Sequence, residues 1–332
     1  METSSIEVIA TTISGSIKDW GKVEKIVPLF KEQGRDNVSL HVVDSHAGAR
    51  ETAGRLLKGD ARVIISAGGS GTFNAVLEGC IDSGVGLSSI TLGFLRKGSA
   101  DLIGKTLDMP DDIEDAIEVF NRSIALGRTV PCDVIQATCG TKGSVPRHFV
   151  GYGGAGIFGR IPHFTENRYT KYYKGILSQL FGDLGPFFTG ASLASLETVV
   201  RGWFGGKRSW KITVDGTGVD KGIFQAMIIV NGDLGPDLPF ARDVPLGSGD
   251  FHMFAIRDLG ILKLPKQFSK AFDGSIMDEP GKWGFAAYAV KESLRIESDS
   301  VGAFPVNIDG STMMSIDWAE FRIVDRINLI AG

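Results

Sequence analysis

The organisation of this 332-residue chain follows from one segment, Val63-Ile64-Ile65-Ser66-Ala67-Gly68-Gly69-Ser70-Gly71-Thr72-Phe73-Asn74-Ala75-Val76-Leu77-Glu78-Gly79. A short β-branched run leads into a glycine cluster, and a helical pattern follows with Phe73, Val76 and Leu77 on one face. Residues without a side chain let successive backbone N–H groups turn inward and close on an anion. The following helix points the positive end of its dipole at the same place. The segment therefore predicts a strand, a phosphate-binding loop and a helix, with an ordinary tight turn as the alternative.

Two common nucleotide-binding motifs do not fit this loop. In a GxGxxG dinucleotide motif, Asn74 would stand where the third glycine belongs, and no acidic residue ends the next predicted strand, Ser88–Phe94. A P-loop needs a Gly-Lys-Ser or Gly-Lys-Thr sequence, which does not follow. What remains is a Gly-Gly-x-Gly-Thr phosphate loop at Gly68–Thr72.

The first part of the chain alternates predicted strands and helices. The strands are Ile6–Thr12, Val38–Val42, Val63–Ala67 and Ser88–Phe94, and the helices are Trp20–Gln33, Ala47–Leu57, Asn74–Ile81 and one opened by Asp111-Asp112. Such alternation predicts a parallel sheet covered on both faces, with ligands at the carboxyl ends of the strands. We place this α/β domain at residues 1–128.

After about Thr129 the pattern becomes β-rich. Strand-like runs separated by turn residues occur at Val130–Ala137, His148–Gly151, Lys211–Val214, Phe224–Asn231, Phe251–Ile256, Trp283–Val290, Ser293–Glu297, Val306–Asp309 and Phe321–Val324. Two amphipathic segments, Tyr169–Phe181 and Ser192–Trp203, predict a helical insert. We place a second, β-rich domain at residues 129–332 and leave open whether its last strand returns to the first domain.

Composition narrows the class of protein. A net charge of −4 argues against a general nucleic-acid binder, and net charge alone also argues against strong attraction to anionic membranes. The cysteines lack metal-ligand spacing, so we predict buried, reduced thiols at Cys80, Cys132 and Cys139. We expect no signal peptide and no transmembrane segment, and hence a soluble, cytoplasmic protein.

Two further loops resemble the first in composition. Thr91–Leu102 ends a strand with Arg96, Lys97, Gly98 and Ser99, and Thr11–Ser16, which contains Ser14 and Gly15, follows the first strand. Carboxyl ends of parallel strands share one edge of the sheet, so the three loops are expected to form one site. The alternative for the second loop is an ordinary connection in which Arg96 and Lys97 are solvated.

In these motifs the sequence resembles the diacylglycerol kinase catalytic family, which includes bacterial lipid kinases and sphingosine and ceramide kinases. Gly68-Gly69-Ser70-Gly71-Thr72-Phe73-Asn74-Ala75 stands where the family has Gly-Gly-Asp-Gly-Thr-x-Asn-Glu. Arg96–Asp101 is similar to its Pro-x-Gly-Thr/Ser-Gly-Asn element, and Thr11–Gly15 to its Asn-Pro-x-Ser-Gly. Asp309-Gly310-Ser311 stands at its closing Asp-Gly-Glu. Further landmarks that look alike are Gly151–Phe158, Asn231-Gly232 and Gly249–Ile256.

The resemblance implies an NAD-kinase-like α/β domain followed by a β-sandwich domain that holds a lipid. It also implies ATP with Mg²⁺, and transfer of the γ-phosphoryl group to a lipid hydroxyl. Asp309 would be the catalytic residue and the candidate ligand of Mg²⁺. The implied nucleotide-site residues are Ser14, Gly15, Gly68, Gly69, Ser70, Gly71, Thr72, Asn74, Arg96, Lys97, Gly98 and Ser99, with Arg168, Lys171 and Lys174 of the insert as candidates to neutralise the phosphates.

Three acidic positions of the family pattern are not acidic here. They are Ser70 in the loop, Ala75 after Asn74, and Ser311 in the closing motif, so Asp309 is the one family carboxylate left at a catalytic position. The alternative for Asp309 is a simple Asp-Gly turn between two strands. Because phosphoryl transfer depends mainly on positioning and electrostatics, such a site could still turn over slowly.

A segment that contacts lipid is predicted from aromatic residues that lie next to basic ones. Trp203-Phe204-Gly205-Gly206-Lys207-Arg208-Ser209-Trp210 suits contact with a membrane interface, and core packing is the alternative. We expect a lipid substrate, transient contact with a membrane surface and no nucleic acid, and we leave a homodimer open.

The preferred function at this level is an ATP-dependent lipid kinase acting on a diacylglycerol or sphingoid-type hydroxyl. Two alternatives stay open. One is a nucleotide-binding pseudokinase that acts as a regulatory module, favoured by Ser70, Ala75 and Ser311. The other is a kinase of the NAD kinase type with a soluble acceptor.

Overall fold

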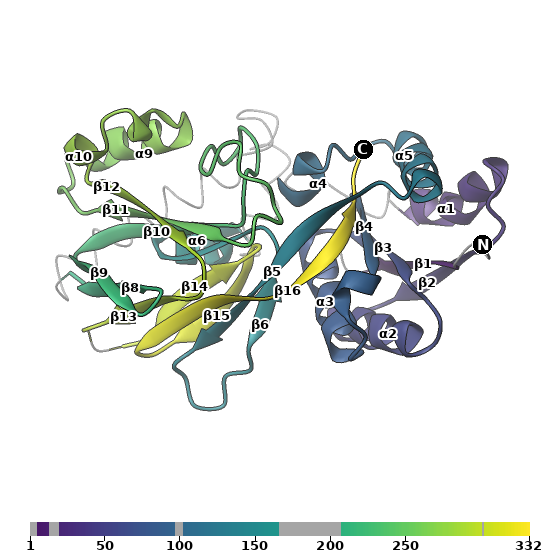
Figure 1. Cartoon of the computed structure of the whole chain (residues 1–332), viewed down its shortest axis with the longest axis horizontal. Coiled ribbons are helices and arrows are strands. Elements are labelled where there is room, and N and C mark those ends of the chain that lie inside the picture. The colour runs from purple at the N-terminus through teal and green to yellow at the C-terminus, as the bar shows by residue number, and fades with distance from the viewer. Residues whose placement is uncertain (1–4, 13–19, 97–101, 166–206, 301) are drawn as a thin grey trace. The chain divides into compact units, whose positions relative to one another are not determined.

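The computed structural model describes residues 5–12, 20–96, 102–165, 207–300 and 302–332 (Figure 1). The chain forms two compact units. Unit 1 consists of Met1–Val134 and Asp325–Gly332, and unit 2 consists of Ile135–Val324. The last residues of the chain therefore belong to the same unit as the first.

A parallel sheet forms the centre of unit 1. Its strands are β1 (Ile6–Thr11), β2 (Val38–Val43), β3 (Val63–Gly68) and β4 (Thr91–Arg96), in the order β2-β1-β3-β4, and the end of β16 (Trp318–Ile330) pairs with β4. The register pairs Thr11 with Val43 and Gly68 with Arg96, which places these strand ends along one edge. The predicted parallel sheet is confirmed.

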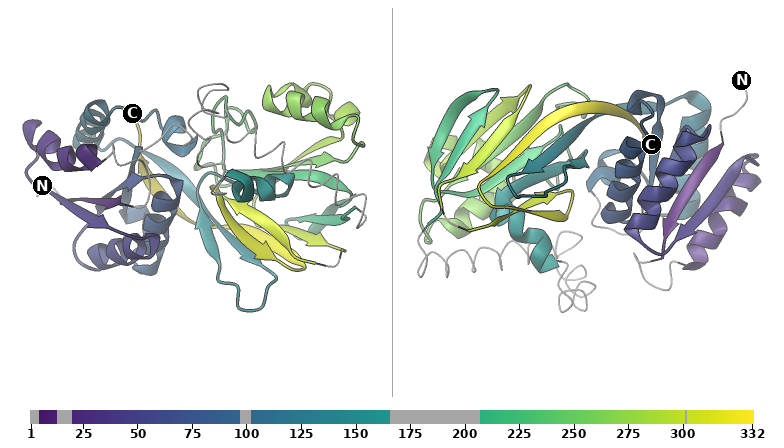
Figure 2. Two further views of the ribbon diagram at one scale, coloured as in Figure 1. Left: turned by 180° about the vertical axis from the view of Figure 1, so that it is seen from behind. Right: turned by 90° about the horizontal axis from the view of Figure 1, so that it is seen from below.

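Helices cover both faces of this sheet. They are α1 (Trp20–Glu32), α2 (His46–Lys58), α3 (Ser70–Asp82), α4 (Leu102–Thr106) and α5 (Ile113–Leu126). The pair α1 and α5 lies on one face and the pair α2 and α3 on the other (Figures 1 and 2). Coverage on both sides explains why every residue of β1 is buried. Asp112 caps α5 by accepting from the Glu114 amide, as the Asp111-Asp112 signal predicted.

Unit 2 contains two sheets. One has the order β12-β11-β10-β7-β14-β15, and the other contains β5, β6, β8, β9, β13 and the first part of β16. The bounds are β5 (Thr129–Cys139), β6 (Arg147–Phe149), β7 (Tyr152–Gly156), β8 (Trp210–Val214), β9 (Thr217–Gly222), β10 (Phe224–Val230), β11 (Phe251–Arg257), β12 (Phe285–Val290), β13 (Leu294–Ser298), β14 (Phe304–Ile308) and β15 (Ser311–Ser315).

One core joins the two sheets of unit 2. Met227 and Phe251 of the first sheet share a buried cluster with Ile296 and Phe321 of the second. In the part of unit 2 that the structure describes, the α-helices are α6 (Ile157–Thr165), α9 (Leu264–Phe272) and α10 (Pro280–Trp283). The predicted fold class, an α/β domain followed by a β-rich domain, is confirmed.

Some predicted elements differ from the structure. Helix α3 begins at Ser70 and not at Asn74, because residues 70–72 form its first turn and not part of a free loop. The predicted strand Ser88–Phe94 is replaced by a 3₁₀ turn over Leu87–Ser89 followed by β4. Strands β7, β9 and β15 and helices α6 and α9 were not predicted. The three strands are short or rich in glycine, and the two helices span only nine residues each, too few for the periodic pattern to be recognised.

Two further expectations concern buried residues. The three cysteines are buried free thiols, as predicted, and burial raises the pKa of the Cys80 thiol to about 12. Trp210 is 2% exposed and its ring packs 4.9 Å from that of Phe304, so its predicted contact with a membrane is wrong. The predicted helical insert, with Trp203 and Phe204, lies outside the described residues.

Candidate functional site

The predicted phosphate loop lies where β3 ends and α3 begins. Gly68 ends the strand, Gly69 precedes the helix in extended conformation, and the amides of Thr72 and Phe73 donate to the Gly69 carbonyl at 3.0 and 3.1 Å. No described side chain caps this N-terminus, whereas Ser45 caps α2. An uncapped helix N-terminus at the carboxyl edge of a parallel sheet suits a phosphate group.

Thr72 connects this loop to the end of β1. Its hydroxyl lies 2.7 Å from that of Thr11, and both side chains are buried. A Cβ placed on Gly68 would lie 2.5 Å from the Thr72 Oγ1, so the chain passes here only because residue 68 has no side chain. Two of the three predicted loops therefore meet, although Ser14 and Gly15 lie outside the described residues.

A histidine that the sequence did not single out lies beside the loop. His46 opens α2, and a Cβ placed on Gly71 would lie 2.8 Å from its Cε1 atom. The His46 side chain is exposed, and the residue follows β2 at the same sheet edge. In the sequence, the one feature that pointed to His46 was its position just after a predicted strand, because no motif surrounds it.

Close packing of α2 on α3 brings the two helix N-termini together. A Cβ on Gly79 would lie 2.3 Å from the carbonyl oxygen of Arg50 and 2.7 Å from the Ala53 Cβ, so glycine lets the helices approach. The Arg50 guanidinium and the Asp82 carboxylate join them at the surface, with Nη2 to Oδ1 at 2.9 Å. Both positive helix ends consequently face one edge of the sheet.

Other predicted residues of unit 1 lie in different surroundings. Ser70 is exposed in the first turn of α3, while Asn74 is buried one turn later, at 1% exposure. Arg96 is buried as well, and its Nη1 donates to the Met109 carbonyl at 3.0 Å and lies 3.1 Å from an Asp111 carboxylate oxygen. The solvated interpretation of Arg96 is therefore wrong. Lys97, Gly98, Ser99, Arg168, Lys171 and Lys174 lie outside the described residues.

Asp309 lies in unit 2, in the turn between β14 and β15. Its backbone has a φ of 43°, and Gly310 follows with a φ of 83°, so the residues form a tight Asp-Gly hairpin turn. The carboxylate accepts hydrogen bonds from the amides of Val150, Gly151 and Tyr152 at 3.1, 3.2 and 2.7 Å. Asp309 is thus both a residue of a tight turn and a buried carboxylate held in a fixed orientation.

Two asparagines hold the same region of unit 2. Asn231, fully buried, donates to the Val150 carbonyl at 2.8 Å. Asn307 accepts from the Gly310 amide at 3.0 Å through its side-chain oxygen. Asn307 therefore fixes the Asp309 turn from β14, and Asn231 fixes the segment whose amides hold the carboxylate, which lowers the entropy cost of keeping the carboxylate in one orientation.

Burial raises the pKa of Asp309 to about 6, and the three backbone hydrogen bonds oppose this rise. At neutral pH most of the carboxylate is then ionised, while its affinity for a proton is well above that of an ordinary aspartate. A carboxylate with this pKa can accept a proton from a hydroxyl that is losing it.

The surroundings of Asp309 do not fit a magnesium site. Both carboxylate oxygens accept from amide N–H groups, whose positive ends oppose a cation. In the described part of the chain no group of three His, Cys, Asp or Glu side chains is arranged to hold a metal ion. We therefore derive no step of the reaction through a magnesium ion.

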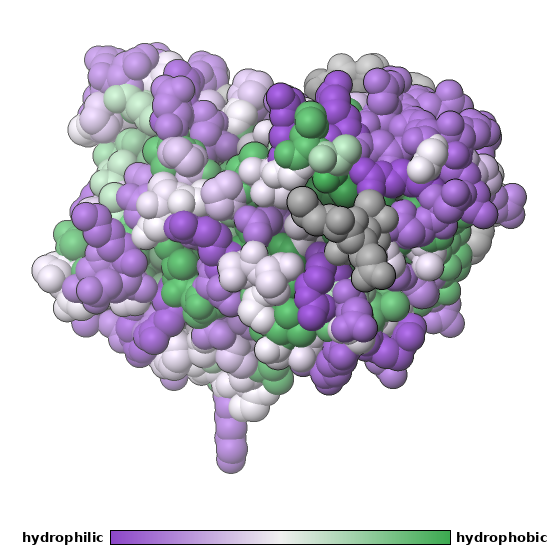
Figure 3. Space-filling view, turned by 45° about the vertical axis from the view of Figure 1, so that its right-hand side comes forward, coloured by the Kyte–Doolittle hydropathy of each residue, from purple (hydrophilic) through white to green (hydrophobic). Residues whose placement is uncertain are grey.

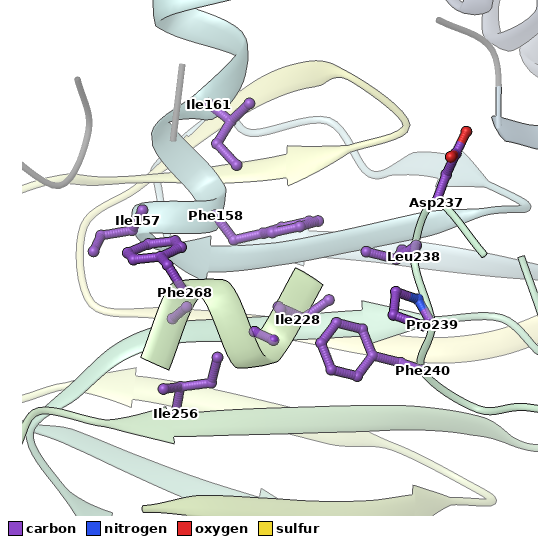
Figure 4. Close-up of a pocket in the computed structure, with 12 residues that line it drawn as sticks. Ile157, Phe158, Ile161, Ile228, Asp237, Leu238, Pro239, Phe240, Ile256 and Phe268 are labelled. Carbon is purple, nitrogen blue, oxygen red and sulfur yellow. The ribbon is translucent and has the colours of Figure 1, made fainter. Parts of the chain in front are cut away.

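Unit 2 also contains an apolar pocket with a cavity volume of about 40 Å³, which opens partly to solvent (Figure 4). Its walls come from α6, β10, β11, α9 and the segment 237–240. The Phe158, Phe240 and Phe268 rings and the Ile228 side chain gather around it in Figure 4. Among the described residues in its lining, Asp237 is the one charged side chain. Such a lining suits a hydrocarbon chain.

Comparison with known proteins gives the family of unit 1. Residues 5–137 match the diacylglycerol kinase catalytic domain family. A curated diacylglycerol kinase of Staphylococcus haemolyticus (strain JCSC1435) is 32% identical over 89 residues, which is 27% of this chain and 26% of that protein. The chain thus spans about a quarter of the length of the curated relative it matches. The resemblance drawn from the sequence motifs is confirmed.

Solved structures show the same fold over the whole chain. A diacylglycerol kinase from Bacillus anthracis str. Sterne aligns over 100% of this chain and 98% of that one, with a TM-score of 0.66 and 17% identity. Yeast NADH kinase complexed with NADH aligns over 100% of this chain and 84% of that one, with a TM-score of 0.55 and 10% identity. At these identities the likeness concerns the fold alone.

Proposed function

Because the chain carries a diacylglycerol kinase catalytic domain over residues 5–137, we propose that it is a lipid kinase. In this proposal it transfers the γ-phosphoryl group of ATP to the hydroxyl of a diacylglycerol or sphingoid-type lipid. The observation that carries the proposal is the uncapped, glycine-entered N-terminus of α3 at the carboxyl edge of the sheet, within that domain.

The nucleotide phosphates are proposed to bind at the start of α3. Gly69 leaves space there, since, apart from its two chain neighbours, no atom of the described residues lies within 4 Å of the place where a Cβ would be. The N-terminal dipoles of α2 and α3 favour negative charge at this edge. The amides of Thr72 and Phe73 already donate to the Gly69 carbonyl, so the preceding amides of Ser70 and Gly71 are the proposed donors, by the geometry of a helix end. His46 is proposed as an additional donor to the phosphates.

The lipid is proposed to place a hydrocarbon chain in the apolar pocket of unit 2. Ile157, Phe158 and Ile161 of α6 supply one wall, and Phe268 of α9 faces them. Burial of apolar surface contributes roughly 25 cal/mol per Å², so a chain seated against these side chains gains several kcal/mol. A kinase with a small polar acceptor would not need such a lining.

Asp309 is proposed to accept the proton of the lipid hydroxyl. With a pKa of about 6 the carboxylate is mostly ionised at pH 7, and the amides of residues 150–152 hold it in a fixed orientation. Loss of a positioned base typically reduces the rate by about 10² to 10⁴. Most of the remaining catalysis in phosphoryl transfer comes from positioning and charge, which matches a site with few carboxylates.

A nucleotide-binding pseudokinase is the second candidate. It is favoured by the side chains at the three altered family positions: Ser70, at the start of α3, is an exposed hydroxyl, and Ala75 and Ser311 also bear no charge. The fold shared with an NADH kinase keeps a soluble acceptor as a third candidate, against which the apolar pocket argues.

The test is transfer of labelled γ-phosphoryl from ATP to diacylglycerol, sphingosine and ceramide in mixed micelles. ATP is supplied as its magnesium complex, because Mg²⁺ usually reaches kinase sites on the substrate phosphates. We expect product from the wild type and a loss of about 10² to 10⁴ in kcat for Asp309→Asn. Product formed only by Ser70→Asp would favour the pseudokinase, and product formed only from a water-soluble acceptor would favour the third candidate.

A further inference from the structure

The segment between β11 and β12 forms an outer part of unit 2 (Figure 1). It contains Gly260-Ile261-Leu262-Lys263, then α9, and then α10. The sequence pattern of α9 is strongly amphipathic, with Leu264 and Gln267 buried and Lys266 and Ser269 exposed. Net charge had argued against attraction to anionic membranes, but net charge does not report a local surface.

Two large apolar side chains protrude just before α9. Leu262 is 93% exposed, which is the largest value for a large apolar residue in the described part of the chain, and Ile261 beside it is 51% exposed. The face of the molecule in Figure 3, by contrast, is mostly hydrophilic, with apolar residues in small groups. Single exposed apolar residues are common, whereas an adjacent pair at the tip of a turn is typical of contact with a partner.

Lysines surround this apolar pair and continue along α9. Lys263 and Lys266 are exposed in the first half of the segment, and Lys270 follows one turn later. The ammonium groups of Lys266 and Lys270 each lie 5.5 Å from the centre of the Trp283 ring, which brings the two positive charges to the same ring. We call Ile261, Leu262, Lys263, Lys266 and Lys270 the α9 patch.

Acidic residues lie toward the C-terminal end of the segment, where Asp273 and Glu279 interact with Lys270. Lys263 and Lys266 lie nearer its start. Glu279 pairs with Lys282 at 2.9 Å, and Asp273 follows the last residue of α9, with Asp278 beyond it. Lys263 and Asp273 are separated by the whole helix, about 15 Å at a rise of 1.5 Å per residue. Since charges are screened over roughly 8 Å at physiological ionic strength, the basic end keeps its positive potential.

The α9 patch is held in place by hydrogen bonds. Asp258 accepts from the Gly260 amide at 2.7 Å, which fixes the turn that carries Ile261 and Leu262. The buried Gln267 donates to the carbonyls of Arg257 and Trp283 at 3.0 and 2.8 Å, which ties α9 to β11 and α10. A surface that is already ordered loses little conformational entropy on binding.

The opposite side of α9 lines the apolar pocket. Phe268 and Ala271 of this helix belong to the pocket, and Leu264 packs with Ile157 of α6. The helix that carries the exposed lysines therefore also forms part of the wall of the proposed lipid site (Figure 4). A bilayer in contact with the α9 patch would supply its lipid next to that wall.

We propose that the α9 patch docks the protein on an anionic lipid bilayer, with Ile261 and Leu262 inserted among the acyl chains and the lysines at the headgroup phosphates. The idea that docking delivers the substrate rests on the proposed function, but the docking itself does not. Apolar residues at a tip, flanked by cations with long aliphatic stems, match the two layers of a membrane interface. An acidic protein partner would explain the lysines but not the contact of the same helix with the pocket.

The test is co-sedimentation of the full chain with vesicles of phosphatidylcholine alone or with phosphatidylglycerol added. We expect wild-type binding that requires phosphatidylglycerol and weakens with salt. A doubly substituted Ile261→Ser, Leu262→Asp variant should bind at least tenfold more weakly, and so should Lys263→Glu, Lys266→Glu, since each basic residue near the surface contributes about fivefold.

Matched controls are Leu126→Asp, which replaces another exposed apolar residue, 62% exposed, and Lys58→Glu, at the exposed end of α2. Both should bind vesicles as the wild type does. Circular dichroism and melting temperature verify that every variant is folded. Absence of wild-type binding, or equal binding by the patch variants, would overturn the proposal and leave the surface to a protein partner. Because sedimentation needs no turnover, failure of the kinase proposal would be seen separately in the micelle assay.

Discussion

Two glycine-containing turns carry the proposed chemistry, and they are built in opposite ways. At Gly69 the absence of a side chain leaves room beside a helix N-terminus for a phosphate, while Gly68 lets the chain pass close to Thr72. At Asp309-Gly310 the turn instead buries a carboxylate under the amides of residues 150–152. A phosphate site therefore needs an open space beside backbone amides. A carboxylate that accepts a proton instead needs burial and close packing, which raise its pKa.

The largest effect is expected from removing the charge of Asp309. Its pKa lies near 3.8 in the unfolded chain and about 6 in the fold, so the native state binds more protons between these values. Stability therefore decreases as the pH rises from about 4 to about 6, by roughly 3 kcal/mol at 1.36 kcal/mol per pKa unit. In Asp309→Asn this part of the pH dependence should be absent.

Urea unfolding of both proteins at a series of pH values measures the difference. The loss of hydrogen bonds in Asp309→Asn lowers the free energy of unfolding by the same amount at every pH. The slope of this free energy against pH therefore reports the titration of Asp309 alone. Parallel curves between pH 4 and 6 would mean that Asp309 titrates normally and is an ordinary turn residue.

The next effect concerns the space at Gly68. In Gly68→Ala the new methyl group meets the buried Thr72, which is bonded to Thr11, so the loop must shift and stability should fall by about 1–3 kcal/mol. In Gly69→Ala the methyl group meets no described residue within 4 Å beyond its chain neighbours, and stability should change by less than about 0.5 kcal/mol. Equal losses in thermal or urea unfolding would contradict the assignment of Gly68 as the tight position.

The smallest effect is expected at Gly71. A methyl group there meets the His46 ring, which is the end of an exposed side chain and can move at a cost of about 1 kcal/mol or less. The double variant Gly71→Ala, His46→Ala should recover that loss. A double-mutant cycle in which the two changes are simply additive would show that His46 does not lie against the loop.

The α/β unit could be predicted in detail from the sequence because its signals are local. The glycine cluster, the Asp112 cap and the hydrophobic periods each act within about four residues. The contact between Thr11 and Thr72 followed from the topology of parallel strands, since their carboxyl ends share one edge.

Other features depend on residues distant in sequence and could not be predicted. Asp309 was identified by its motif, but its partners lie more than 150 positions away, and so the burial that raises its pKa was not visible. Trp210 was assigned to a surface because basic residues precede it, although its partner in the core is Phe304. The α9 patch was missed because Ile261 and Leu262 appear apolar, and only the fold shows that they are exposed.

Calorimetric titration can show whether the start of α3 binds the phosphates of a nucleotide. ATP and adenosine would each be titrated into the wild type and Gly69→Ala. We expect saturable ATP binding that weakens at least tenfold in the folded Gly69→Ala protein, while adenosine binding is unaffected by the substitution. Equal ATP affinity in the two proteins, or no ATP binding by the wild type, would contradict this proposal.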